Sequence, residues 1–519
     1  MIHTSPLPDI ELPRSELSEF VLADAETRGE HPALVDGTTG RVIDYATLRG
    51  LVDRVARALA GAGLRAGDVV AVYAPNTVLY PVACYAASRA GATVTTVNAL
   101  YTPGELIGQL ADSGASLLVT ISHFLPALAS VDLPAGLREV LVLDQAPGYR
   151  SLLDLPADPD QPLPTVDPAE DIALLPYSSG TTGTAKGVRL THSNLTAAIA
   201  QMVSAMPIGP EHRVLAVLPF SHVYGFATMM GMGLRAGATI VVLPRFDLEQ
   251  FLRTIAEQRI TVALIAPPIA LALAKHPLVD QYDLSSLWRV LSAASPLDPD
   301  ISALVHRRIG VPVVQAYGMT ESSSGCHVPP GETVPPAGSV GVLLPQTECR
   351  LVSTATGADV GVGEVGELVV RGPQVMKGYL NRPEETAATL DAEGWLRTGD
   401  IGRVDADGWF YIVDRVKELI KYKGYQVAPA ELEAVLVGHP QIADAAVVGV
   451  PGADGEEVPK AFVVRQPGAD GLDDRQVMDF VAERVAPYKK VRAVEFIQTV
   501  PRSIAGKILR RELRDAATA

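Results

Sequence analysis

The chain has 519 residues, enough for roughly three domains or subdomains, and its 48% hydrophobic and 20% charged residues are typical of a globular protein with a large core. Its net charge of −16 repels nucleic acid and anionic membranes, so we expect neither as a partner, and any anionic ligand must be held by local cations. The longest apolar run, at positions 263–274, contains two prolines and is too short to span a bilayer.

The first 170 or so residues alternate helical segments with short apolar strands. VDRVARALAGAGL precedes GDVVAVYAPN, and YPVACYAASRAGA precedes TVTTVN. The same alternation returns later in RVLAVLP, TIVVLP, ITVALIAPP and WRVLSAA. This pattern predicts parallel sheets with helices on both faces, and an active site at the carboxyl ends of the strands.

A loop rich in glycine and hydroxyl side chains, YSSGTTGTAKG, occupies positions 177–187. Glycines let the backbone turn its N–H groups inward, hydroxyls add donors, and one lysine supplies positive charge, which together suit a polyphosphate. The loop differs from the GxxxxGK[ST] type, because alanine precedes the lysine and glycine follows it. A flexible linker is the alternative. The predicted phosphate-binding residues are Ser178, Ser179, Gly180, Thr181, Thr182, Gly183 and Lys186.

The pattern changes near residue 340, where GEVGELVVRGP, WLRTGD and DGWFYIVDR indicate β-rich structure. After Lys417, strand-like ADAAVVGV and KAFVVRQ and a helical DDRQVMDFVAERV indicate a compact α+β unit. We therefore expect an α/β fold. Residues 1–413 form a large N-terminal domain of parallel-type sheets flanked by helices plus a β-rich subdomain, 414–417 a hinge, and 418–519 a small C-terminal domain.

Several polar motifs lie far from the loop in sequence. QAYGMTE at 315–321 follows the apolar VPVV and ends in a hydroxyl and a carboxylate, and TGD at 398–400 places Asp400 in a predicted turn. DRVKELIKYKG at 414–424 and PRSIAGKILRREL, which contains Lys507, are cationic. Taken singly, Asp400 is equally well a turn residue, Lys507 a surface lysine and RVKELIK a solvated helical face.

In this order the motifs resemble those of the adenylate-forming superfamily of acyl-CoA synthetases, nonribosomal adenylation domains and firefly luciferases. DRVKELIKYKGYQVAPAELE and LPFSHVYG are most similar to 4-coumarate–CoA ligases and their acyl-CoA ligase relatives. The resemblance implies a mobile C-terminal lid and two half-reactions that use ATP, Mg²⁺ and coenzyme A. A carboxylic acid and ATP give an acyl adenylate and pyrophosphate, and the thiol of coenzyme A then displaces AMP.

The resemblance also implies roles for single residues in the nucleotide site. The loop Ser178–Lys186 holds the leaving phosphates, and the lysine of the C-terminal motif bridges the substrate carboxylate and the α-phosphate. That lysine is Lys507. The other implied contacts are the α-phosphate for Thr320, Mg²⁺ for Glu321, adenine for Tyr317, and the ribose for Asp400 and Arg415. Lys417 matches the hinge, and Lys421 and Gln426 match residues of the thioester step.

The acyl pocket is implied in the same way. His222 matches a residue that closes the passage between the acyl and nucleotide sites, and Tyr224 one that contacts a ring hydroxyl. The implied lining is His222, Tyr224, Thr228, Leu291, Ala294, Ala316, Gly318 and Ser324. Ala316 stands where plant coumarate ligases have glycine, and Ser324 stands where they have proline, so we expect a tighter slot with a more polar far wall.

An ATP-dependent ligase for an aromatic, cinnamate-like acid is the function expected from the sequence. A stand-alone adenylation enzyme that loads a carrier protein, a medium-chain fatty acyl-CoA ligase and a luciferase-like oxygenase are the alternatives, and the sequence leaves the oligomeric state open. Three widely spaced cysteines, Cys84, Cys326 and Cys349, favour buried thiols in a reduced, cytoplasmic compartment. The N-terminus lacks a secretory signal and the C-terminus DAATA is not a peroxisomal signal.

Overall fold

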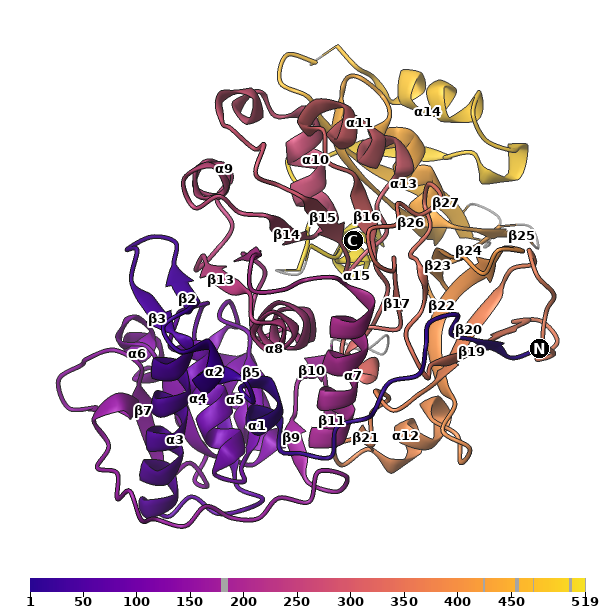
Figure 1. The fold of residues 1–519 in the computed structure, drawn as a ribbon. Coiled ribbons are helices and arrows are strands. Elements are labelled where there is room, and N and C mark those ends of the chain that lie inside the picture. Colours follow the sequence, from indigo (N-terminus) through magenta and orange to yellow (C-terminus); the bar gives the residue numbers. More distant parts are fainter. Residues whose placement is uncertain (179–184, 423–424, 453–456, 470, 504–505, 519) are drawn as a thin grey trace.

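The computed structural model describes residues 1–519 except 179–184, 423–424, 453–456, 470, 504–505 and 519. Large sheets with flanking helices form the N-terminal part, and a smaller α+β unit follows near the C-terminus (Figure 1). This is the predicted fold class. Among the described residues, no helix combines the length and the apolar composition needed to cross a membrane.

The first sheet has the strand order β10-β11-β9-β5-β4-β6-β7-β8 and is parallel in its centre. Its strands are β4 (Val69–Tyr73), β5 (Thr93–Val97), β6 (Ala115–Thr120), β7 (Glu139–Val142), β8 (Arg150–Ser151), β9 (Ile172–Leu174), β10 (Tyr177–Ser178) and β11 (Lys186–Thr191), with β21 (Gly378–Tyr379) paired to β11. The helices of this region are α3 (Tyr45–Gly61), α4 (Tyr80–Arg89), α5 (Pro103–Ser113), α6 (Leu125–Leu128) and α7 (His192–Ala205).

The second sheet has the order β16-β15-β14-β12-β13-β2-β3 and is parallel except at its β2–β3 edge. Its strands are β2 (Pro32–Asp36), β3 (Val42–Asp44), β12 (Arg213–Ala216), β13 (Thr239–Val242), β14 (Val262–Ile265), β15 (Arg289–Ser292) and β16 (Val313–Gln315). Among its connections are the π-helix η3 (Tyr224–Met232) and the helices α8 (Gly233–Ala236), α9 (Leu248–Glu257), α10 (Pro267–Lys275) and α11 (Pro299–Ile309). The motif QAYGMTE begins at the carboxyl end of β16, as predicted.

The β-rich part is an antiparallel sheet with the order β1-β19-β20-β22-β23. Its elements are β1 (His3–Thr4), β19 (Glu348–Val352), β20 (Gly366–Arg371), β22 (Leu396–Val404), β23 (Phe410–Arg415) and the nearby helix α12 (Pro383–Thr389), with the hairpin β17 (His327–Val328) and β18 (Val342–Leu343) beside it. Asp400 lies within β22, so the prediction of a turn at TGD was wrong. Gly399, at φ +70°, accommodates a register irregularity there while the strand continues.

The C-terminal unit follows a turn that contains Lys417. It comprises the hairpin β24 (Ile420–Tyr422) and β25 (Tyr425–Val427), the helices α13 (Pro429–Val437), α14 (Asp474–Ala482) and α15 (Arg510–Thr518), and the sheet β26 (Ile442–Pro451), β27 (Glu457–Arg465) and β28 (Ala493–Phe496). Its core of buried side chains, which includes Ile420, Leu432 and Val447, is separate from the large core that runs from Leu17 to Phe410.

Local capping fixes several strand-to-helix junctions that position the site. β11 begins at Lys186 and ends at Thr191, which forms a reciprocal capping box with Asn194 at the start of α7. α10 begins with two prolines shortly after β14. Proline is tolerated there because the N–H groups of the first helical turn have no partner within the helix. Cys84, Cys326 and Cys349 are free and buried, as expected.

Candidate active site

A cavity lies at the carboxyl ends of β15 and β16 and against η3. All eight residues predicted to line an acyl pocket border it, with Met202, Met206, Val223, Ala293, Tyr317, Met319, Gly325 and Val328 in addition. Its volume of about 40 Å³ holds roughly three water molecules. Met202 and Met206 come from α7 and the residue that follows it, and no motif in the sequence pointed to these two. Their flexible thioethers allow the walls to adjust to a larger occupant.

Unusual backbone geometry shapes one wall of this cavity. A Cβ atom placed on Gly318 would lie 1.4 Å from the carbonyl oxygen of Ser324, so only glycine fits there. Ala294 and Ser324 have φ values of +75° and +104°, which side chains with a Cβ rarely adopt. Such strain is often found at functional sites.

The cavity has a small polar wall and a buried phenol. The hydroxyls of Thr228 and Ser324 are 2.7 Å apart and hydrogen bonded, and Thr228 also lies 3.3 Å from the sulfur of Met202. The Tyr224 hydroxyl donates to the carbonyl oxygen of Leu291 at 3.3 Å, and burial raises the pKa of this phenol. The cavity therefore offers hydroxyl groups in a mostly apolar surface.

His222 stands between this cavity and the charged part of the site. Its Nδ1 accepts a hydrogen bond from the Tyr224 N–H at 3.3 Å, which leaves the proton on Nε2 in the neutral ring. Burial, assisted by the charge of Lys507, lowers the pKa of His222 to about 4. The imidazole is therefore a neutral donor at physiological pH.

Asp400 is held by two partners that come from different elements. The Tyr317 hydroxyl donates to Oδ2 at 2.6 Å, and Nε of Arg415 lies 2.9 Å from Oδ1. Arg415 faces Asp400 because the two residues are register partners in the β22–β23 pair. A carboxylate offers about four lone-pair sites, so Asp400 retains capacity for the hydroxyls of a ligand. The predicted ribose and adenine contacts thus lie side by side.

Glu321 is a buried carboxylate directly after Thr320, in a short 3₁₀ turn (Thr320–Ser322) that follows β16. Ser178 donates to its Oε1 at 3.0 Å, and Tyr379 donates to the same oxygen at 2.9 Å. Among the described residues Oε2 accepts no hydrogen bond and is available to a cation. Sequence reasoning missed Tyr379, which β21 brings beside β11.

The residues of the predicted phosphate loop from 179 to 184 lie outside the described residues, so the predictions for Ser179, Gly180, Thr181, Thr182 and Gly183 have no structural counterpart. The two ends of the loop are described. Ser178 contacts Glu321, and Lys186 is buried with its ammonium paired to Glu385 and 5.0 Å from the ring centre of Tyr379. Phosphates that enter the loop would compete with Glu385 for this cation.

The two lysines of the C-terminal unit lie in different surroundings. Lys507 is close enough to Arg415, Asp400 and His222 for their charges to interact, and burial with the neighbouring arginine lowers its pKa to about 8. Lys421 is exposed on β24, and its N–H donates to Glu457 at 2.9 Å. The backbone of Gln426 pairs with Lys421, and its side chain lies outside the described part. Of the two lysines, Lys507 is thus the one whose charge reaches Asp400, Arg415 and His222.

The chain is similar to known proteins along nearly its whole length. Residues 21–380 match the model of the AMP-binding enzyme family, and residues 431–507 match that of the AMP-binding enzyme C-terminal domain. The chain is 40% identical over 525 residues to 4-coumarate–CoA ligase 5 of Oryza sativa subsp. japonica, covering 99% of this chain and 97% of the relative. It is 39% identical over 532 residues to 4-coumarate–CoA ligase of Pinus taeda, covering 100% and 98%.

Solved structures show the same fold. An anthranilate CoA ligase, AuaEII, in complex with anthranoyl-AMP superposes with a TM-score of 0.89 at 27% identity, covering 98% of each chain. ATP-bound MatB from Rhodopseudomonas palustris superposes with a TM-score of 0.88 at 30% identity, covering 97% of this chain and 99% of that chain.

Proposed function

The chain belongs to the family of AMP-binding enzymes, and we propose that it is an ATP-dependent ligase that joins an aromatic carboxylic acid to coenzyme A. The observation that carries the proposal is that Tyr317 both lines a mostly apolar cavity and holds Asp400, which Arg415 also contacts, with Lys507 near enough to interact electrostatically with Asp400 and His222. This arrangement provides a cation between a nucleotide site and an acid site. The full-length similarity to 4-coumarate–CoA ligases supports the same reaction.

In the first half-reaction, a carboxylate oxygen of the acid attacks the α-phosphorus of ATP. The bond from that phosphorus to the bridging oxygen breaks, and pyrophosphate leaves. Lys507 has the role of binding the carboxylate and the α-phosphate oxygens, a task suited to a compact point charge. Tyr317 and the Asp400–Arg415 pair hold the adenosine, Thr320 the α-phosphate, and the loop Ser178–Lys186 the leaving phosphates.

Glu321 is the residue that would hold Mg²⁺. The ion usually binds one or two carboxylates together with substrate phosphates, which fits a single buried carboxylate with one available oxygen. When bound there, the ion would offset the negative charge that develops on the leaving phosphates.

In the second half-reaction, the thiol sulfur of coenzyme A attacks the carbonyl carbon of the acyl adenylate. The bond from that carbon to the AMP oxygen breaks, the thiol loses its proton, and AMP leaves. The exposed position of Lys421 supports a lid, residues 418–519, that rotates about Lys417 and brings Lys421 and Gln426 to the site for this step. His222 has the role of a neutral gate between the two sites.

The acid is of the cinnamate or benzoate kind. The slot lies between apolar walls and ends at the hydroxyls of Thr228 and Ser324, which suits a flat ring with a small polar substituent. Relatives named for 4-coumarate and anthranilate, both aromatic acids, support this class. Medium-chain fatty acids, and a carrier protein as the acceptor, are the competing possibilities. The free, buried thiols support a cytoplasmic location.

The test separates the two half-reactions. ATP–pyrophosphate exchange and thioester formation are measured over a panel of cinnamic, benzoic and medium-chain acids, with coenzyme A and with a phosphopantetheinylated carrier protein as acceptors. We expect exchange with an aromatic acid and transfer to coenzyme A. A preference for the carrier protein, or for medium-chain acids, contradicts the proposal.

A further inference from the structure

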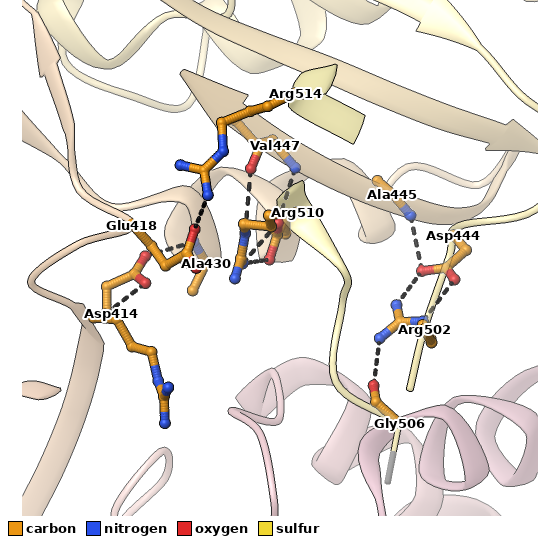
Figure 2. Close-up of polar contacts among 12 residues, drawn as sticks. Asp414, Glu418, Ala430, Asp444, Ala445, Val447, Arg502, Gly506, Arg510 and Arg514 are labelled. Carbon is orange, nitrogen blue, oxygen red and sulfur yellow. Dashed lines mark hydrogen bonds and ion pairs between the residues drawn. The ribbon is translucent and has the colours of Figure 1, made fainter. Parts of the chain in front are cut away.

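The first turn of helix α13, which belongs to the proposed lid, donates a hydrogen bond to a side chain outside the lid. Its N-cap residue, Ala428, has no side chain that can cap. Instead Oδ2 of Asp414 accepts the N–H of Ala430 at 3.0 Å, as Figure 2 shows. Asp414 is buried and belongs to β23, where it pairs with Ile401. A carboxylate at a helix start satisfies an unpaired donor and complements the helix dipole.

The other end of α13 contacts the large domain through a cation. Lys275, the last residue of α10, donates from Nζ to the carbonyl oxygen of Val437 at 2.9 Å and to that of Ile442 at 3.3 Å. Val437 is the last residue of α13, where carbonyl oxygens have no partner within the helix. A cation is favoured at this end of a helix, just as an anion is at the other. Both ends of α13 are thus held by charged side chains that precede Lys417 in the chain, Asp414 on β23 and Lys275 on α10.

A third contact lies directly beside Lys507. A Cβ atom on Gly506 would come within 3.1 Å of Ala266 and Pro268, at the start of α10, and Gly506 has φ +81°. Its carbonyl oxygen accepts from Arg502 at 3.0 Å, and Arg502 pairs with Asp444 at 2.8 Å (Figure 2). The segment before Lys507 is therefore tied to the lid and packed on the large domain. α10 meets the lid at both of its ends.

We propose that Lys275 and Asp414 are positioning residues that hold the lid in the orientation in which Lys507 reaches the site. This inference rests on the proposed two-step function and on rotation about Lys417. Lys275 and Asp414 precede Lys417 in the chain, whereas Ala430, Val437 and Ile442 follow it. A rotation about Lys417 moves the whole of α13 away from both charges, so both contacts belong to the adenylate-forming orientation alone.

The contacts of Lys275 and Asp414 shift the equilibrium between the two lid orientations toward the adenylate-forming one. When the lid rotates faster than either reaction, the ratio of the adenylation rate to the transfer rate follows the ratio of the two lid populations. A contact made only in the adenylate-forming orientation favours that orientation by some factor, and loss of the contact lowers the ratio by the same factor. This holds even when one of the two orientations is much more populated than the other. For one charge at a helix end we expect a factor of about three to ten.

The first experiment measures this ratio in Lys275→Met. ATP–pyrophosphate exchange reports adenylation, and single-turnover transfer from preformed acyl adenylate to coenzyme A reports the second step. We expect the ratio to fall about three- to tenfold, with partial recovery in Lys275→Arg. Asp414→Ala should act in the same direction and Asp414→Asn less, because an amide oxygen still caps a helix.

The matched control is Lys460→Met, which removes a lysine that pairs with Glu495 at 2.8 Å within the lid. Its contact does not change when the lid rotates, so its ratio should equal that of the unaltered enzyme. An unchanged ratio in folded Lys275→Met, or an equal fall of both rates, would overturn the inference and leave the proposed function intact.

A second measurement needs no substrate. Dyes on Arg253→Cys in α9 and Arg475→Cys in α14, both exposed, report the distance between the large domain and the lid by energy transfer. The native cysteines are buried, so the introduced thiols take the dyes. The two lid orientations should give two dye-to-dye distances. Lys275→Met should increase the population of molecules with the distance of the orientation that does not form the adenylate. Unchanged populations reject the positioning role whatever acid the enzyme uses, whereas failure of all acids in the exchange assay rejects the proposed function.

Discussion

The nucleotide side and the acyl side of the site are built in different ways. On the nucleotide side, the two carboxylates are fixed by other polar side chains: Tyr317 and Arg415 hold Asp400, and Ser178 and Tyr379 hold Glu321. The partners come from distant elements, so the charges are oriented before a ligand arrives. Such preorganisation is what stabilises charge that develops during a reaction.

The acyl side depends instead on backbone shape. Gly318 allows the chain to approach Ser324 closely, and Ala294 presents one methyl group from a left-handed backbone position. Space, more than charge, then decides which acid enters. Changes on the nucleotide side should therefore alter the rate for every acid, while changes on the acyl side should alter the choice of acid.

Removal of the lid lysines gives the largest expected effect. Lys507→Ala should lower ATP–pyrophosphate exchange about 10³-fold for all acids, because one charge is lost where charge develops. Transfer from preformed acyl adenylate should survive. Lys421→Ala should show the reverse, with adenylate formed and slowly consumed. Equal loss of both half-reactions in both variants contradicts a rotating lid.

Glu321→Gln should lower adenylation about 10²-fold, again for every acid, because the amide keeps the shape but not the charge. The expected signature is a higher Mg²⁺ concentration at half-maximal exchange. Tyr379→Phe is the partner variant, since it leaves the carboxylate and removes one donor from its Oε1. It should produce a smaller effect in the same direction. Normal Mg²⁺ dependence in Glu321→Gln rejects the assignment.

The pH profile offers a test without substitution. The pKa of Lys507 is lowered to about 8, and the role proposed for it requires the charged form. Adenylation kcat/KM for ATP, which reports the free enzyme, should therefore be constant below pH 8 and fall about tenfold per pH unit above it. His222, with its pKa lowered to about 4, stays neutral throughout this range. The same fall in the transfer step would show that another group titrates.

Ala294→Gly should give the smallest effect, and only on the choice of acid. One methyl group in an apolar pocket is worth about 1–3 kcal/mol of discrimination, and we expect the low end because only part of one wall recedes. The ratio of kcat/KM for ring-substituted and simple cinnamates should rise about tenfold. Glycine also accepts φ +75° without strain, so the melting temperature should not fall. An unchanged ratio places Ala294 outside the slot.

The sequence predicted the architecture well because hydrophobic periodicity and chain order are local signals. The alternating segments before residue 340, the β-rich part and the final α+β unit all lie where they were expected. The turn predicted at Asp400 was wrong, because a glycine before an acid marks a strand irregularity as well as a turn.

Contacts across large sequence separations escaped the prediction. Tyr379 lies 58 residues from Glu321, and Lys275 lies 162 residues from Val437. No sequence pattern predicts either pair, because each contact depends on how two distant elements pack against each other. The π-helix at Tyr224–Met232 was also not predicted, and there Gly225 comes close to the backbone of Pro219, which lies only six residues earlier.

The register between β22 and β23 has a consequence for the order in which products leave. Asp400 and Arg415 are cross-strand partners, and both precede Lys417. A lid that rotates about Lys417 carries Lys507 away and leaves this pair in place. The ribose contacts proposed for Asp400 and Arg415 would therefore persist through both half-reactions, so pyrophosphate should depart first and AMP last. AMP should accordingly compete with ATP, while the thioester should not.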